Sequence, residues 1–196
     1  LLSALRKALP DASIDYLTDA TFAPLLENNP DVRRVVEWRI VRKHHESKSA
    51  FYRSQAKLYR QLRRQKYDLV IDLFGNPRTA LLTWFTGAGL RVGGDFRGRG
   101  ALYNYRVQAP EHQISSISFH MKSLERLGLS VESTAPEVWL TEGERKQGRE
   151  YLRSLNIDDK KPLVGIHPGA TWENKHWPLE AFAQLIRSLR RRGLQI

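Results

Sequence analysis

Residues 167–178, HPGATWENKHWP, place small residues, a hydroxyl and a lysine between a strand-like run, 163–166, and a helical pattern that begins at Pro178. Small residues let backbone N–H groups approach a ligand, and a helix N-terminus supplies unpaired donors and a positive dipole end. The segment therefore predicts a phosphate site. Its candidate ligands are the backbone of Gly169 and Ala170, the Thr171 hydroxyl and the Lys175 ammonium.

The chemistry of such a site is the stabilisation of a leaving group that departs as a phosphate anion. Neither the G-x-x-x-x-G-K pattern nor G-x-G-x-x-G is present in the loop. The alternative is a simple turn in which Lys175 is solvated and Trp172 and Trp177 pack in the core. The residues of the loop leave these two interpretations equally open.

The elements around the loop alternate between strands and helices, which is typical of a parallel α/β architecture. Residues 50–66 form the clearest amphipathic helix, and residues 68–73 read as a strand buried in a parallel sheet. Thr141 and Glu144 fit a capping box. The change of composition near 141–161 marks the expected domain boundary.

The composition is that of a globular protein with a strong positive charge. The chain has 196 residues, a formal net charge of +11 and no cysteine, so disulfide frameworks and thiolate metal sites are excluded. Residues 31–66 contain 12 Lys/Arg and 3 Asp/Glu. This stretch would attract a polyanion such as nucleic acid, a phosphorylated sugar or an anionic membrane, or it is an ordinary solvated surface.

The whole loop motif, from Ile166-His167-Pro168-Gly169-Ala170 to Lys175-His176-Trp177-Pro178, resembles the signature of the lipopolysaccharide heptosyltransferases, glycosyltransferase family 9. The resemblance covers essentially the whole chain. The upstream segments that are also similar to the family are Asn29-Pro30, residues 67–73, Gly75-Asn76 with Arg78, residues 91–93 and Tyr103-Asn104.

The resemblance implies a GT-B fold, two Rossmann-like domains of which the first is nearly complete and the second only begun. Residues 1–141 would be the acceptor-binding domain without its first strand, and residues 142–196 the start of the nucleotide-sugar donor domain. The family's proposed general base, a carboxylate, would lie upstream of this chain, so the fragment alone is expected to be inactive.

The resemblance further implies transfer of heptose from ADP-heptose, as a co-substrate, to the lipopolysaccharide inner core, with inversion and with neither a cofactor nor a required metal. Gly169, Ala170, Thr171 and Lys175 would contact the donor diphosphate, and Arg78 an anionic group of the acceptor. A cytoplasmic location is expected, with peripheral contact with an anionic membrane at the inner face of the inner membrane.

Asp72 and Asp95 are not assigned the role of general base, and His44-His45, His112 and His120 do not form a metal site. Asp72 is expected to end a buried strand, and His167 and His176 to shape the loop. His112 and His120 are too far apart on one predicted helix to share an ion. Arg97 and Arg99 are weaker candidates of the same kind as Arg78.

Other functions remain open from the residues alone. The residues of the loop are suited to binding phosphate and do not specify the base or the sugar of the donor. A GT-B glycosyltransferase with another nucleotide sugar is therefore one alternative. A non-enzymatic module that binds a polyanion or a membrane surface through the helix at 50–66 is another. No motif for specific nucleic-acid recognition is present.

Overall fold

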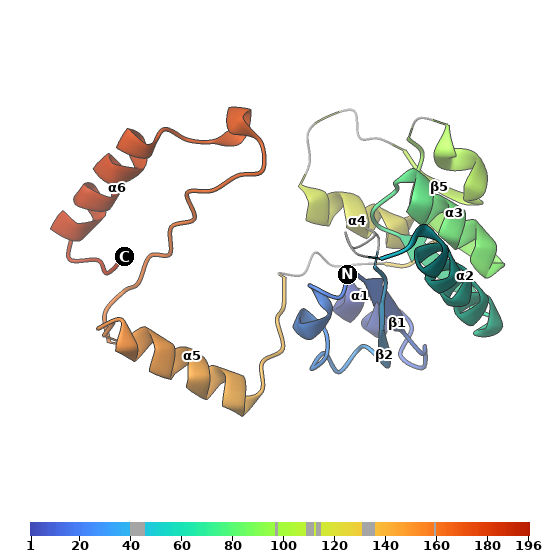
Figure 1. Ribbon diagram of the computed structural model, residues 1–196, viewed down its shortest axis with the longest axis horizontal. Coiled ribbons are helices and arrows are strands. Elements are labelled where there is room, and N and C mark those ends of the chain that lie inside the picture. The colour runs from blue at the N-terminus through green and yellow to red at the C-terminus, as the bar shows by residue number, and fades with distance from the viewer. Residues whose placement is uncertain (40–45, 97, 109–111, 113–114, 131–135, 159) are drawn as a thin grey trace. The chain divides into compact units, whose positions relative to one another are not determined.

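The computed structural model describes residues 1–196 except 40–45, 97, 109–111, 113–114, 131–135 and 159. The chain divides into two compact units, Leu1–Trp139 and Leu140–Ile196 (Figure 1). The expected boundary, residue 141, lies next to this division. The acceptor and donor roles of the two parts stay predictions.

Unit 1 (Leu1–Trp139) alternates short strands with helices. Its strands are β1 (Asp15–Thr18), β2 (Arg34–Glu37), β3 (Leu69–Asp72), β4 (Leu90–Gly94) and β5 (Tyr105–Val107). Its helices are α1 (Leu2–Ala8), α2 (Lys48–Arg64), α3 (Pro77–Thr86) and α4 (Ser116–Glu125), with 3-10 turns η1 (Ala23–Leu25) and η2 (Arg99–Leu102).

All the described strands pair in parallel, as the alternation predicts. β1 pairs with β2, and a second sheet has the order β3-β4-β5. β5 was not predicted, because its three residues are too short for a periodic pattern. Since the carboxyl ends of parallel strands meet at one edge, the loops after β3 and β4 lie where open α/β sheets bind ligands.

Two apolar clusters hold the helices on the strands. The first joins α1 and α4 around β1 through Ala4, Leu5, Ile14, Met121 and Leu124. The second packs α2 and α3 through Val36, Trp38, Leu58, Leu62 and Leu82. The Trp38 Nε1–H donates to Gln55 Oε1 at 2.7 Å, so the one polar atom of this ring is satisfied.

Unit 2 (Leu140–Ile196) contains α5 (Glu142–Ser154), the 3-10 turn η3 (Glu173–Lys175) and α6 (Leu179–Arg191). The capping box is confirmed, because Thr141 Oγ1 accepts from the Glu144 N–H and Glu144 Oε2 accepts from the Thr141 N–H. The predicted strand at 163–166 is reduced to one parallel bridge, Leu163 to Gln195.

No helix in the described parts of the chain combines the length and the apolar character needed to cross a bilayer.

Candidate functional site

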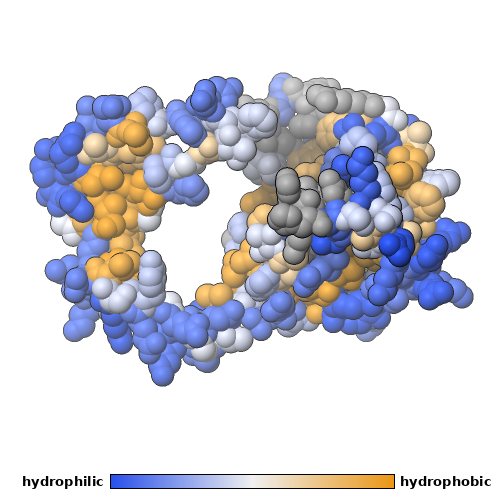
Figure 2. Space-filling view, in the orientation of Figure 1, coloured by the Kyte–Doolittle hydropathy of each residue, from blue (hydrophilic) through white to orange (hydrophobic). Residues whose placement is uncertain are grey.

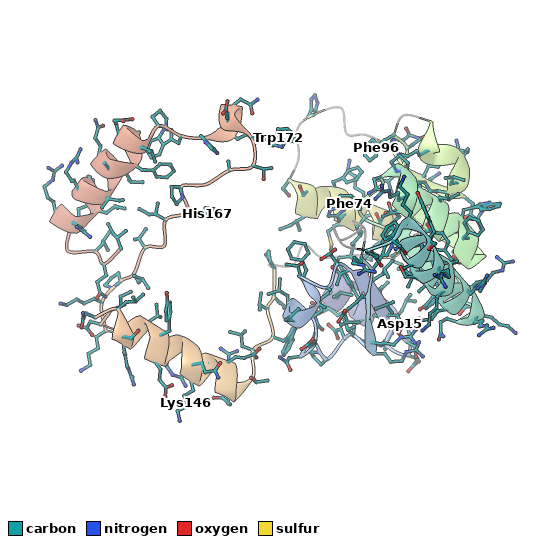
Figure 3. All side chains as sticks on the ribbon, in the orientation of Figure 1. Asp15, Phe74, Phe96, Lys146, His167 and Trp172 are labelled. Atoms are coloured by element: carbon teal, nitrogen blue, oxygen red, sulfur yellow. The ribbon has the colours of Figure 1, made fainter. Side chains whose placement is uncertain are left out.

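The segment 167–178 closes on itself before α6 begins. The Gly169 N–H donates to His167 Nδ1 at 3.1 Å, and His176 Nε2–H donates to the Ala170 carbonyl oxygen at 2.6 Å. Figure 3 shows His167 and Trp172 on the segment that leads to α6. η3 lies between the two ends of the closure, so Lys175 sits on a short turn that hydrogen bonds fix.

Gly169, at the start of this closure, packs close to the His167 ring. A Cβ atom at Gly169 would lie 3.0 Å from His167 Cε1, closer than most side chains tolerate. The four predicted ligands, Gly169, Ala170, Thr171 and Lys175, are all exposed. They lie within seven residues on one loop that the His176 contact draws together, and their side chains and backbone are accessible to a solute.

The start of α6 differs from the prediction in one respect. Pro178 is the N-cap residue, with an extended backbone, and the helix itself begins at Leu179. The Pro178 carbonyl oxygen accepts from the Ala181 N–H at 3.0 Å. Glu180 lies in the first turn, where its carboxylate already compensates the positive helix end. Lys175 must therefore supply most of the attraction for an anion.

The tryptophans of the loop are not in a core. Trp172 is 64% exposed and Trp177 is 49% exposed, and the Trp177 ring contacts Phe182 edge to face at 4.8 Å. The simple-turn alternative is therefore wrong in placing both rings in a core, whereas the exposed Lys175 agrees with it. Exposed indoles beside a lysine offer flat apolar surface next to a positive charge.

The prediction that His167 and His176 shape the loop is confirmed by their two hydrogen bonds to the loop backbone, whereas sequence reasoning missed the Ala170 partner of His176 and Glu180 as an opposing charge. The His176 contact spans six residues inside a loop, and no periodicity predicts it. Glu180 could have been found, because an acidic residue in the first turn of a predicted helix is a common N-terminal signal.

The second candidate region is the carboxyl end of β3 in unit 1, where Asp72 is buried. Asp72 Oδ1 accepts from the N–H groups of Phe74 and Gly75, at 3.0 and 2.9 Å, and Oδ2 accepts from the Tyr103 hydroxyl at 2.6 Å. Burial and this last bond raise the pKa of Tyr103. Both carboxylate oxygens are thus engaged in shaping the turn, as the structural interpretation of Asp72 predicts.

Glycines next to this turn make room for aromatic rings. A Cβ atom at Gly94 would lie 2.1 Å from the Phe96 ring, and one at Gly93 would lie 2.4 Å from the Tyr103 ring. The Phe96 ring also contacts Phe119 of α4, with centroids 5.6 Å apart. Phe74, just after β3, is 73% exposed. Figure 3 shows Phe74 and Phe96 at the same end of unit 1.

Arg78 lies in the first turn of α3, directly after this turn. Asn76 caps the helix, since its Oδ1 accepts from the N–H groups of Arg78 and Thr79. Arg78 is exposed. Burial raises the pKa of Tyr59 on α2, and the charge of Arg78 offsets part of this rise. The function of Arg78 as an acceptor ligand stays a prediction.

A separate cavity of about 270 Å³ lies in unit 1 and does not include Arg78. It is lined mainly by residues of α1, β1 and α4 and by the loops after η1 and β3, among them Leu2, Tyr16, Asn29, Leu73, His120 and Met121. Partial burial lowers the pKa of His120.

The third charged cluster lies at the other end of the strands, around Asp15 at the start of β1 (Figure 3). Arg33 donates to both Asp15 oxygens at 2.9 Å, Arg34 donates to Oδ2, and the Tyr67 hydroxyl donates to Oδ2 at 2.6 Å. Burial alone would raise the pKa of Asp15, but the three donors hold it below its usual value. Burial and the bond to Asp15 raise the pKa of Tyr67 to about 12.

This Asp15 cluster ties β1, β2 and the start of β3 together, so its charges are used inside the fold. Arg97 and the pair His44-His45 lie outside the described residues, and Arg99 lies in η2. Among the residues that the structure describes, no three His, Asp or Glu side chains gather closely enough to hold a metal ion.

Comparisons with known proteins agree with the loop motif. The sequence model of glycosyltransferase family 9 (heptosyltransferase) matches residues 55–196. Lipopolysaccharide heptosyltransferase 3 of Escherichia coli (strain K12) is 27% identical over the whole chain, and lipopolysaccharide heptosyltransferase 1 of that strain is 26% identical. The chain spans 56% and 60% of the length of these two curated relatives.

Solved structures show the same fold. A glycosyl transferase family 9 protein from Veillonella parvula has a TM-score of 0.78 at 25% identity, over 98% of this chain and 55% of that one. An E. coli heptosyltransferase solved with ADP has a TM-score of 0.65 at 23% identity, over 96% of this chain and 58% of that one. The α/β fold of GT-B type is therefore confirmed, and the chain belongs to glycosyltransferase family 9, the heptosyltransferases.

Proposed function

We propose that this chain is part of an enzyme that transfers heptose from ADP-heptose to the lipopolysaccharide inner core, with inversion and without a required metal ion. The observation that carries the proposal is the closed loop at 167–178, which presents Lys175 on η3, before α6, within the segment that matches the family. The relatives are lipopolysaccharide heptosyltransferases, and one related enzyme was solved with ADP.

In the proposed reaction an acceptor hydroxyl oxygen attacks the anomeric carbon, and the bond from that carbon to the donor diphosphate breaks on the opposite face. The hydroxyl proton passes to a general base, a role that no residue of this chain is assigned. Negative charge develops on the departing ADP. The Lys175 ammonium, the Thr171 hydroxyl and the backbone of Gly169 and Ala170 would stabilise it in place.

The proposed site needs no metal because Lys175 supplies a fixed positive charge where a bound cation acts in other transferases. The helix end adds less than it would without Glu180. Removing the lysine charge should therefore weaken the diphosphate contact without altering the base or the sugar contact.

On the acceptor side, we propose that Arg78 contacts an anionic group of the lipopolysaccharide core. It lies just after the carboxyl end of β3, where ligands bind in open α/β sheets. Changing Arg78 to Ala in the full-length enzyme should raise the acceptor KM about ten-fold, as expected for one charged hydrogen bond. Arg126→Ala, another exposed arginine of unit 1, is the matched control. An unchanged acceptor KM would remove the assignment.

The proposed location is the cytoplasm, at the inner face of the inner membrane, where a lipid-anchored acceptor and a soluble nucleotide sugar can meet.

The test of the reaction is transfer by the full-length protein to a lipopolysaccharide core acceptor, with ADP-heptose, UDP-sugars and GDP-sugars compared in the presence of a chelator. We expect transfer from ADP-heptose alone, retained with the chelator, and inverted product stereochemistry. Transfer from a UDP- or GDP-sugar would keep the fold and replace the donor. Loss of transfer on chelation would overturn the metal-independent mechanism.

A further inference from the structure

The outer surface of the α2–α3 layer in unit 1 combines a basic stripe with an apolar one. α2 contains six Lys/Arg residues and no acidic residue between Lys48 and Arg64. Lys57, Arg60, Gln61, Arg64 and Gln65 line a shallow exposed hollow along this helix, on the face opposite the buried Leu58 and Leu62. Figure 2 shows hydrophilic residues gathered over the end of α2.

The neighbouring helix turns apolar side chains outward. Ala80, Leu82, Thr83 and Thr86 of α3 are buried, whereas Leu81 is 42% exposed, Trp84 50% and Phe85 39%. A helix on the surface of a globular domain normally faces solvent with polar residues. This outward face of α3 is therefore apolar where a soluble surface would be charged.

The two helices form one continuous layer. The Phe85 ring stacks on Tyr59 of α2, with centroids 5.4 Å apart, and Arg63 of α2 donates to the Phe85 carbonyl oxygen at 3.1 Å. The basic stripe of α2 and the apolar stripe of α3 are thus held side by side. We name this surface, made by Lys57, Arg60, Arg64, Leu81, Trp84 and Phe85, the α2–α3 face.

We propose that the α2–α3 face binds the surface of an anionic lipid bilayer. The cations attract the anionic headgroups. Transfer of exposed Leu and Trp side chains into the interfacial region of a bilayer is favourable, and indole rings are enriched there. Neither feature alone is specific for lipid. Their combination on one outer layer matches the chemistry of a negatively charged membrane surface.

The structure favours a bilayer over the other polyanions and partners. Stacking on successive nucleic acid bases needs several free aromatic faces, but Phe85 already stacks on Tyr59 and Leu81 has no ring, so Trp84 alone of these three side chains could stack on a base. A second copy of the chain would bring two α2 helices of the same positive charge together, which is repulsive. An acidic protein would pair with the cations and would gain less from the outward Leu81 and Trp84.

The experiment is co-sedimentation of the full-length protein with vesicles of phosphatidylcholine alone and of phosphatidylcholine mixed with phosphatidylglycerol. We expect binding to the mixed vesicles only, and weaker binding as salt is added. Each basic residue near an anionic surface contributes about five-fold to partitioning, so K57Q/R60Q/R64Q should reduce binding by about a hundred-fold.

The matched control is R145Q/K146Q/R149Q, which removes the same charge from exposed positions of α5. It should change binding by less than about three-fold, because these residues are not part of the α2–α3 face and salt screens the general attraction of the net charge. Trp84→Ser should lower binding at low salt and abolish the part that resists salt. Thermal unfolding of each variant shows that the changes, all at exposed positions, leave the fold intact.

Three outcomes would overturn the proposal: no binding to mixed vesicles at low salt, an equal effect of the two triple variants, or tighter binding to single-stranded DNA than to mixed vesicles. The proposal adds a membrane contact to the proposed function but does not rest on it. Vesicle binding requires neither donor nor acceptor, so a protein that binds vesicles and transfers no heptose would still support it.

Discussion

The Asp15 cluster and the loop at 167–178 use charged residues in opposite ways. The buried Asp15 carboxylate accepts hydrogen bonds from Arg33, Arg34 and Tyr67, and these bonds connect the strands. In the loop, hydrogen bonds between backbone and histidines fix the shape, and Lys175 is left exposed. The paired charges around Asp15 stabilise the fold, whereas the exposed charge of Lys175 is available to bind a ligand.

The largest effect on stability that we expect is at Asp15. Asp15→Asn leaves Arg33, Arg34 and Tyr67 facing an uncharged amide, which should lower the free energy of unfolding by about 2 kcal/mol. This loss is smaller than that expected on breaking a fully buried ion pair, because the two arginines are partly exposed to solvent. Urea unfolding measures it. Unchanged stability would mean that the cluster is only a surface network.

The same cluster gives a pH dependence with a definite sign. Because the pKa of Asp15 is lowered in the folded protein, its contribution is complete above the unfolded-state pKa of about 4 and is lost as the pH falls through the lower folded pKa. The wild-type protein should therefore lose more stability than Asp15→Asn between neutral pH and acid. Parallel losses in the two proteins would contradict the assignment.

A smaller effect is expected at His176, which closes the loop. His176→Ala removes the 2.6 Å bond to the Ala170 carbonyl and frees the turn that carries Lys175. One such bond contributes about 1 kcal/mol, so ADP should bind about five-fold more weakly, with little change in unfolding. A large loss of stability with unchanged ADP affinity would mean that His176 stabilises the fold and does not serve ADP binding. We expect His176→Gln to restore part of the affinity.

The smallest effect is expected at Gly169. An added Cβ would lie 3.0 Å from His167 Cε1, and an exposed ring can move by the few tenths of an ångström required. Gly169→Ala should therefore weaken ADP binding by about two-fold, as for other exposed substitutions. Calorimetric titration of ADP into Gly169→Ala and His176→Ala would show which variant loses more affinity. A larger loss in Gly169→Ala would mean that the backbone at Gly169 directly contacts the phosphate.

Much of the fold follows from local patterns. The helix at 50–66, the strand at 68–73 and the capping box of α5 are each visible because periodicity or capping chemistry operates within a few residues. The loop motif is visible because its residues are contiguous. These are the parts of the molecule in which sequence neighbours are also neighbours in space.

The rest depends on contacts that no local pattern encodes. Tyr67 meets Asp15 across 52 positions, and Tyr103 meets Asp72 across 31. β5 exists because β4 offers it an edge, and the run at 163–166 falls short of a strand because its partner offers only one bridge. The apolar outward face of α3 appears only when the buried face is known.

The central claim is that the loop at 167–178 binds the donor diphosphate through Lys175. The direct measurement is a calorimetric titration of ADP into the full-length protein, its Lys175→Ala variant and Lys146→Ala, which removes an exposed lysine of α5. We predict that ADP binds the wild type and Lys146→Ala alike and binds Lys175→Ala about ten- to a hundred-fold more weakly, as for one charged hydrogen bond. Equal affinity for all three proteins, or no ADP binding to the wild type, would contradict the claim.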